Sequence, residues 1–212
     1  MPRHTESRRR LRATAIWLGL AALTLVLAAG NRLWPAAVLR TPLVDALRTC
    51  DILVLFVFAP ICIWLQWRLL HTVAGEAGAT ACKTLFVIGV YLLGVGFGMH
   101  EPMNALPMHT RLPVALQQSI RFFDDRLGHW IFFSGFLSLV LAVVWAEVRN
   151  PLPVRLERKS AVGVIGVGMV FGAVIFANMV REDTAVDLIV LGVTLALTSL
   201  LWLRNGRPPC HG

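Results

Sequence analysis

Residues 129–147, HWIFFSGFLSLVLAVVWAE, decide the class of this protein, because they form an apolar run with one acidic residue at its end. A helix needs about 20 such residues to cross the hydrocarbon core of a bilayer. Five more segments of this character can be drawn, at about 13–30, 50–70, 84–100, 161–180 and 185–203. Helices satisfy every backbone polar group within one segment, so we predict an all-α, polytopic integral membrane protein with a bundle of six transmembrane helices.

The composition supports this class. Hydrophobic residues make up 57% of the 212 residues, charged residues make up 15%, and the mean hydropathy is +0.69. A soluble domain of this size cannot bury so much apolar surface. We therefore expect a basic N-terminus at 1–12, one six-helix membrane domain at 13–203 and a tail at 204–212, with both ends in the cytoplasm.

The net charge of +8 follows the membrane pattern and does not indicate nucleic-acid binding. Five arginines precede the first apolar run, and most of the other basic residues flank later runs. With the N-terminus inside, thirteen Lys and Arg residues lie on the inner side and seven on the outer side. The positive-inside rule then places both termini in the cytoplasm of an inner-membrane protein. No nucleic-acid partner is expected.

The cysteines give no sign of a disulfide framework or of a zinc cluster. None of the four is part of a CxxC motif, and they lie in unrelated segments, at Cys50, Cys62, Cys82 and Cys210. We interpret them as small apolar residues.

Acidic residues gather on the opposite side from the arginines. Eight of the twelve acids fall at the predicted outer helix ends: Asp45, Asp51, Glu101, Asp124, Asp125, Glu182, Asp183 and Asp187. The histidines and amides predicted at the same level are His100, His109, His129, Asn31, Asn104 and Asn178. Two interpretations remain open, because these side chains can converge on one outer pocket or stand separately in water at helix ends.

The polar residues are concentrated in GVGFGMHEPMNALPMHTRLPVALQQSIRFFDDRLGHW, residues 94–130. His100 and Asn104 are four residues apart, as are Asp125 and His129, and residues at this spacing share a helix face. Two such pairs supply a mixed nitrogen and oxygen donor set. That set suits a divalent metal, zinc first, with iron or copper as alternatives.

Such a metal can activate bound water, and Asp124 or Glu101 is then the candidate general base or the partner that orients a histidine. Two further interpretations compete with the metal site. One is a metal-free acid/base or ligand site. The other is purely structural, because Pro102 is expected to end the third helix near His100. In that interpretation, Asp124 and Asp125 are ordinary first-turn acids of the fourth helix.

Two packing features complete the sequence-based picture. PVALQQSIRFF, residues 113–123, predicts a short amphipathic helix in the third loop, either as a lid or lateral lipid entrance or as a simple connection. Gly94-x-x-x-Gly98 and Gly168-x-x-x-Gly172 suggest that the third and fifth helices pack closely.

The function predicted from these patterns is a membrane-embedded enzyme with an outward-facing His/Asp pocket. We expect it to act on a lipid or another amphiphile by metal-assisted hydrolysis or transfer, with membrane lipids as its partners. The alternative is a transporter, channel or accessory membrane subunit that uses the same residues to bind or relay ions or protons. A transporter is disfavoured by the lack of an internal repeat and by the nearly uncharged helix centres.

Overall fold

The computed structural model describes residues 2–31, 52–75, 79–105 and 112–151, together with short helical pieces between residues 162 and 200. Within these ranges every regular element is a helix. The elements are α1 (Pro2–Asn31), η1 (Val54–Phe58), α3 (Ala59–Ala74), α4 (Ala79–Ala105), α5 (Val114–Arg121), η3 (Phe122–Gly128) and α6 (His129–Arg149).

Four described helices are long and apolar enough to cross a membrane, at Glu6–Asn31, Val54–Ala74, Thr80–His100 and Val114–Arg149. They correspond to the first four predicted spans and indicate an integral membrane protein. The two last predicted spans, 161–180 and 185–203, fall mostly outside the described residues. The structure therefore shows an all-helical protein with these four candidate spans and leaves the six-helix bundle a prediction.

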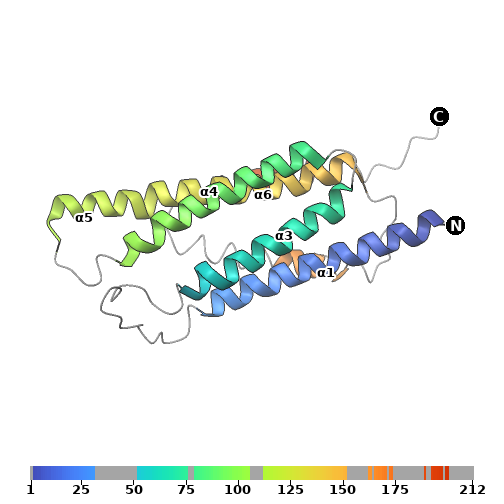
Figure 1. Cartoon of the computed structure of the whole chain (residues 1–212), viewed down its shortest axis with the longest axis horizontal. Helices are drawn as coiled ribbons and strands as arrows, with labels where there is room; N and C mark the ends of the chain where they lie inside the picture. Colours follow the sequence, from blue (N-terminus) through green and yellow to red (C-terminus); the bar gives the residue numbers. More distant parts are fainter. Residues whose placement is uncertain are drawn as a thin grey trace.

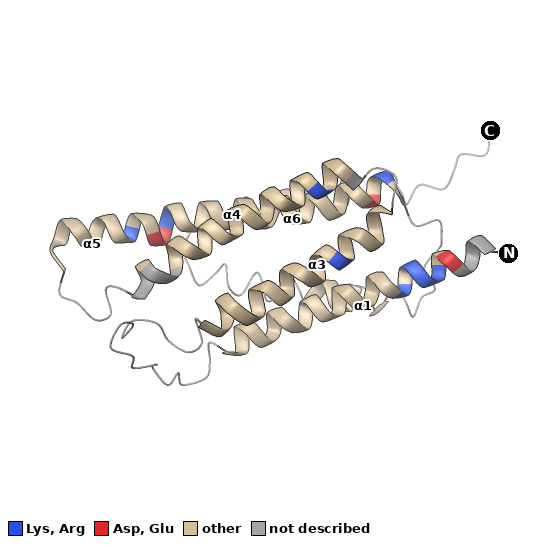
Figure 2. Cartoon of the chain, viewed as in Figure 1, with Lys and Arg blue, Asp and Glu red and all other residues tan. Residues whose placement is uncertain are grey.

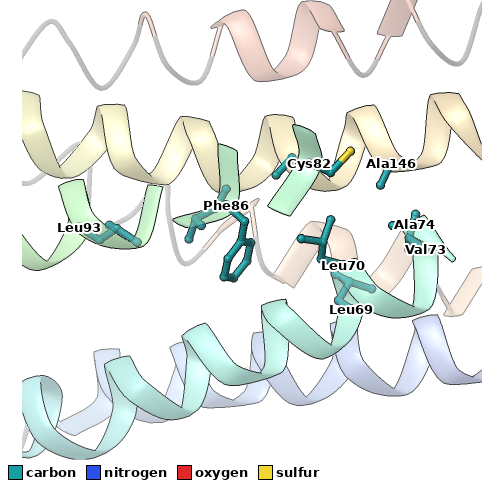
Figure 3. Packing of buried hydrophobic residues seen from close by; sticks show 10 residues of the cluster. Leu69, Leu70, Val73, Ala74, Cys82, Phe86, Leu93 and Ala146 are labelled. Carbon is teal, nitrogen blue, oxygen red and sulfur yellow. The ribbon is translucent and has the colours of Figure 1, made fainter. Parts of the chain in front are cut away.

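The helices pack as two pairs, α4 with α6 and α1 with α3, and α3 joins the pairs through its contacts with both α4 and α6 (Figure 1). The core lies where α3, α4 and α6 meet. Its fully buried members include Leu70 of α3, Cys82 of α4 and Leu139 of α6. Figure 3 shows the α3 side chains of this core facing the α4 residue Phe86. Cys62 and Cys82 are free thiols, and both are buried, as is expected of small apolar residues.

Three glycines allow the backbones of α4 and α6 to approach each other. A Cβ added at Gly96 would lie 2.7 Å from the Phe132 amide nitrogen, and one at Gly135 would lie 2.8 Å from the Gly89 carbonyl oxygen. Only a residue without a side chain fits at such a distance, so small residues determine where these helices touch.

The described residues give no support to the predicted glycine pairing of the third and fifth helices, and most of the fifth predicted span lies outside them. In the described part of the chain, Cβ atoms added at Gly94, Gly98, Gly168 or Gly172 would meet nothing within 4 Å. The third predicted helix packs against the fourth, through Gly89 and Gly96 of the same segment. The GxxxG spacing is common in membrane helices, and it does not identify which face of a helix meets a partner.

The third helix does not end near His100. α4 continues to Ala105 and includes Pro102. A proline removes one backbone hydrogen bond and crowds the carbonyl four residues earlier. Pro102 lies three residues before the end of α4, so few backbone hydrogen bonds of the helix follow it.

Two further expectations, concerning residues 113–128, are corrected by the structure. α5, η3 and α6 form one uninterrupted helical stretch, Val114–Arg149, so the predicted amphipathic segment is not a separate surface helix (Figure 1). Asp124 and Asp125 consequently lie well inside this stretch, where a role as first-turn acids of a new helix does not apply.

The charged residues of the described helices lie toward the two ends of the molecule (Figure 2). We call the end that carries the α1 arginines the basic end, and the opposite end, which carries His100 and Asp124, the His–Asp end. At the basic end, Arg10 donates hydrogen bonds to the carbonyl oxygens of Thr72, Val73 and Asn150. These bonds cap the C-terminal ends of α3 and α6, whose last carbonyls have no partner within their own helix.

Candidate functional site

The candidate site is built around a buried contact between two helices. Nδ1 of His100, in α4, lies 2.6 Å from Oδ1 of Asp124, in η3, and the two side chains are only 14% and 12% exposed. The contact lies outside the angles of an ordinary hydrogen bond, and it is an ion pair when the imidazole is protonated. A carboxylate in this position fixes the orientation of the imidazole ring.

A second histidine lies beside this pair. The ring centroids of His129 and His100 are 4.7 Å apart, and His129 is 6% exposed. Nδ1 of His129 donates a hydrogen bond of 2.9 Å to the backbone carbonyl oxygen of Asp125. A carbonyl can only accept, so this bond places a proton on Nδ1 and makes Nε2 the acceptor nitrogen of the neutral ring.

The π-helical turn of η3 explains why Asp124, and not Asp125, faces the histidines. In a π-helix the backbone bonds join residues five apart, so positions 124 and 129 come onto one side of the helix. Asp124 is buried and Asp125 is exposed. Single π-turns inside α-helices are frequently found at functional sites.

Gly128 lies inside the turn of η3 and faces His100 of α4. A Cβ added at Gly128 would lie 2.8 Å from the Phe123 carbonyl oxygen and 3.7 Å from Cβ of His100. The backbone of η3 therefore runs directly beside His100. A side chain at this position would crowd the Phe123 carbonyl of the same turn and would distort η3 next to the His100–Asp124 pair.

The length of the α5–η3–α6 stretch indicates the depth of the site. Its 36 residues extend for about 54 Å, well beyond the hydrocarbon core of about 30 Å. About 20 residues counted back from Arg149 end near Trp130, which is 53% exposed. Exposed tryptophans are typical of the membrane interface. The site therefore lies near the level at which the apolar span ends, and α5 projects past it.

The structure brings together only part of the predicted site. His100 and His129 adjoin each other, and Asp124 contacts His100. Asp125 approaches His129 through its backbone carbonyl, and its side chain is exposed. Glu101 and Asn104 lie in the last turns of α4, but their side chains fall outside the described residues. In the described part of the chain, no group of three or more His, Cys, Asp or Glu side chains is arranged to hold a metal ion.

Of the other outer polar residues, Asn31 ends α1, and the rest lie outside the described residues. These are Asp45, Asp51, His109, Asn178, Glu182, Asp183 and Asp187. The sequence named Asp124 or Glu101 as the partner that orients a histidine, but it did not say which histidine Asp124 would contact, because nothing in the sequence marks a π-turn. The available signal was the run of two adjacent acids four and five residues before a histidine.

Comparisons with protein-family models, with curated protein sequences and with solved structures found no match to this chain.

Proposed function

We propose that this protein is a membrane-embedded enzyme that acts on a lipid or another amphiphile, with the His100–Asp124 pair and His129 as its proton-transfer groups. The observation that carries the proposal is the buried ion pair between His100 and Asp124, with a second buried histidine against it. Ionisable side chains near membrane depth carry a cost, and they are most often retained for function.

The proposed orientation follows from the distribution of charge. Arginines are concentrated at the basic end, which the positive-inside rule assigns to the cytoplasm. The His–Asp end then faces outward at the membrane interface, where a lipid headgroup and water are both within reach. Charges toward the two ends of the described helices (Figure 2) favour a site at one surface over a path across the membrane.

The chemistry proposed is acid–base catalysis of hydrolysis or transfer. Asp124 holds Nδ1 of His100, so His100 takes up and returns a proton through Nε2, and Asp124 stabilises the imidazolium that forms. His129, fixed by the Asp125 carbonyl, is placed to act as the second proton donor or acceptor. Asp124 is in this scheme a positioning residue, and the two histidines are the candidates for contact with substrate.

A metal-assisted version of the same reaction is the second candidate. It is favoured by one observation: the Nδ1 atoms of both histidines face an oxygen, as they do in many metal-binding histidines. Zinc, or otherwise iron or copper, would bind at Nε2 of the two histidines. The described side chains do not complete a donor set, and Asn104 is the residue proposed to add to it.

The test uses the full chain in bilayer nanodiscs loaded with a total lipid extract, with products followed by mass spectrometry. We expect wild type to change at least one lipid class. His100→Gln should reduce the rate about 10²–10⁴-fold, and Asp124→Asn about 10–100-fold. Asp125→Asn is the matched control and should retain most of the activity. No lipid turnover by wild type, or equal losses in the two Asp variants, would contradict the proposal.

Elemental analysis of the same preparations separates the two versions. One equivalent of metal in wild type, lost in both His100→Ala and His129→Ala, would establish the metal-assisted version. Activity without stoichiometric metal, undiminished by a chelator, would leave the acid–base version.

A further inference from the structure

A second polar site lies on α3 near the basic end, far along the bundle from the histidine pair. Four side chains of its last two turns line an open cavity of about 370 Å³: Trp67, Arg68, His71 and Thr72. The proposed enzyme activity makes no use of this cavity.

The cavity is positively charged and draws on two helices. Lys83, in α4, and Arg68 are the two cations close enough to His71 to act on its charge. Among the described residues, no ion pair joins Arg68, His71 or Lys83 to a carboxylate, and Glu147, at the same end, faces Arg10. The cavity is therefore lined by the guanidinium of Arg68 and by the N–H donor of His71, with Lys83 near His71. Such a set of groups forms a site for an anion.

Aromatic contacts hold the side chains of Arg68 and His71 in place. The guanidinium of Arg68 lies 4.9 Å from the ring centre of Trp17, in α1, and 5.8 Å from that of Trp64. Trp67 contacts the His71 ring edge-on at 4.4 Å and Phe86 of α4 at 5.3 Å. Side chains fixed in advance in this way lose little conformational freedom when they bind a ligand.

The surface beside the cavity is apolar and exposed. Trp64, one turn before Arg68, is 52% exposed, and Ile61, one turn earlier again, is 44% exposed. They continue along α3 toward the centre of its span. A hydrocarbon chain lying on Ile61 and Trp64 would place a headgroup at Arg68 and His71. A free phosphate ion gains nothing from an apolar surface, whereas the acyl chain of a phospholipid can pack against it.

We propose that this cavity binds the phosphate headgroup of an anionic phospholipid, with an acyl chain lying on Trp64 and Ile61. Arg68 and Lys83 supply the charge, and the guanidinium and imidazole N–H groups donate hydrogen bonds to the phosphate oxygens. The arginines of α1 give the same end of the bundle a positive potential, which attracts anionic lipids to it. The lipid comes from the leaflet at the basic end.

The test measures binding of short-chain phosphatidylglycerol to the detergent-purified full chain by tryptophan fluorescence and native mass spectrometry. Phosphatidylcholine of the same chain length and inorganic phosphate are the comparison ligands. We expect phosphatidylglycerol to bind at least about tenfold more tightly than either. Arg68→Gln combined with Lys83→Gln should remove this preference.

The matched control is Arg9→Gln combined with Arg12→Gln, which removes two exposed charges from the same end. It should keep the preference for phosphatidylglycerol. Equal losses in the two double variants would show general attraction to a basic surface and would overturn the site, as would equal binding of the two lipids. Inorganic phosphate that binds as tightly as the lipid would overturn the lipid assignment. Circular dichroism checks whether each variant folds. If the Arg68→Gln, Lys83→Gln variant does not fold, His71→Gln takes its place and should weaken the preference for phosphatidylglycerol.

Discussion

Gly89 of α4 and Gly135 of α6 lie backbone against backbone. A methyl group added at Gly135 would come within 2.8 Å of the Gly89 carbonyl oxygen and 2.7 Å of the Leu93 amide nitrogen. Neither atom can move without displacing its helix. This contact and the one at Gly96 set the distance between α4 and α6, and with it the distance across which His100 contacts Asp124.

Gly135→Ala should therefore destabilise the protein. We expect a loss of about 1–3 kcal/mol, the usual cost of overpacking a close-packed interior, measured by thermal unfolding in detergent. Gly94→Ala is the control, because a Cβ there would meet nothing within 4 Å. It should be neutral or slightly stabilising, since alanine is the better helix former. Equal losses in the two variants would be evidence against the close contact.

The His100–Asp124 pair should be visible as a coupling energy. Asp124→Ala leaves a buried imidazole without its carboxylate, which should cost about 1–3 kcal/mol. Asp125→Ala removes an exposed side chain and should change stability by less than about 0.5 kcal/mol. In a double-mutant cycle with His100→Ala, we expect about 0.5–3 kcal/mol of coupling for Asp124 and none for Asp125. Additive losses at His100 and Asp124 would argue that the two do not interact.

Arg10 is expected to stabilise the packing of the helices at the basic end of the bundle. It binds carbonyls at the ends of α3 and α6 and lies 3.6 Å from the Glu147 carboxylate, with its own side chain 17% exposed. Arg10→Gln should cost about 1.5–3 kcal/mol, the usual contribution of charged hydrogen bonds. It should also speed proteolytic cleavage after α3. Arg9→Gln, at an exposed position of the same helix, should do neither, and a similar effect there would refute the assignment.

The proposed orientation predicts which side of the membrane α5 faces. In a variant with all four cysteines replaced by alanine, Ser119→Cys should react with a membrane-impermeant thiol reagent in intact cells, because residue 119 is exposed and lies beyond the apolar span. Arg9→Cys should react only after the membrane is permeabilised. The reverse labelling pattern would invert the topology and place the His–Asp end in the cytoplasm.

The positions of the first four helices follow from the sequence, because length and hydropathy alone define a segment that can cross a bilayer. The residues that form the candidate site were also identified in advance as a group, since His100, Asp124, Asp125 and His129 are the polar exceptions near two apolar segments. Composition determines the spans and the polar positions because placing a polar group in lipid costs much free energy, and that cost depends on the residue itself more than on its neighbours.

The sequence did not determine which of two adjacent aspartates faces the histidines. Spacing of four residues on a regular α-helix selects Asp125, but the π-turn of η3 shifts the register by one residue and selects Asp124. Helix pairing was equally undetermined, because Gly94 and Gly98 share their motif with many lipid-facing glycines, while Gly89, Gly96 and Gly135 make the contacts. Register and pairing depend on the neighbouring helix, so only the tertiary structure decides them.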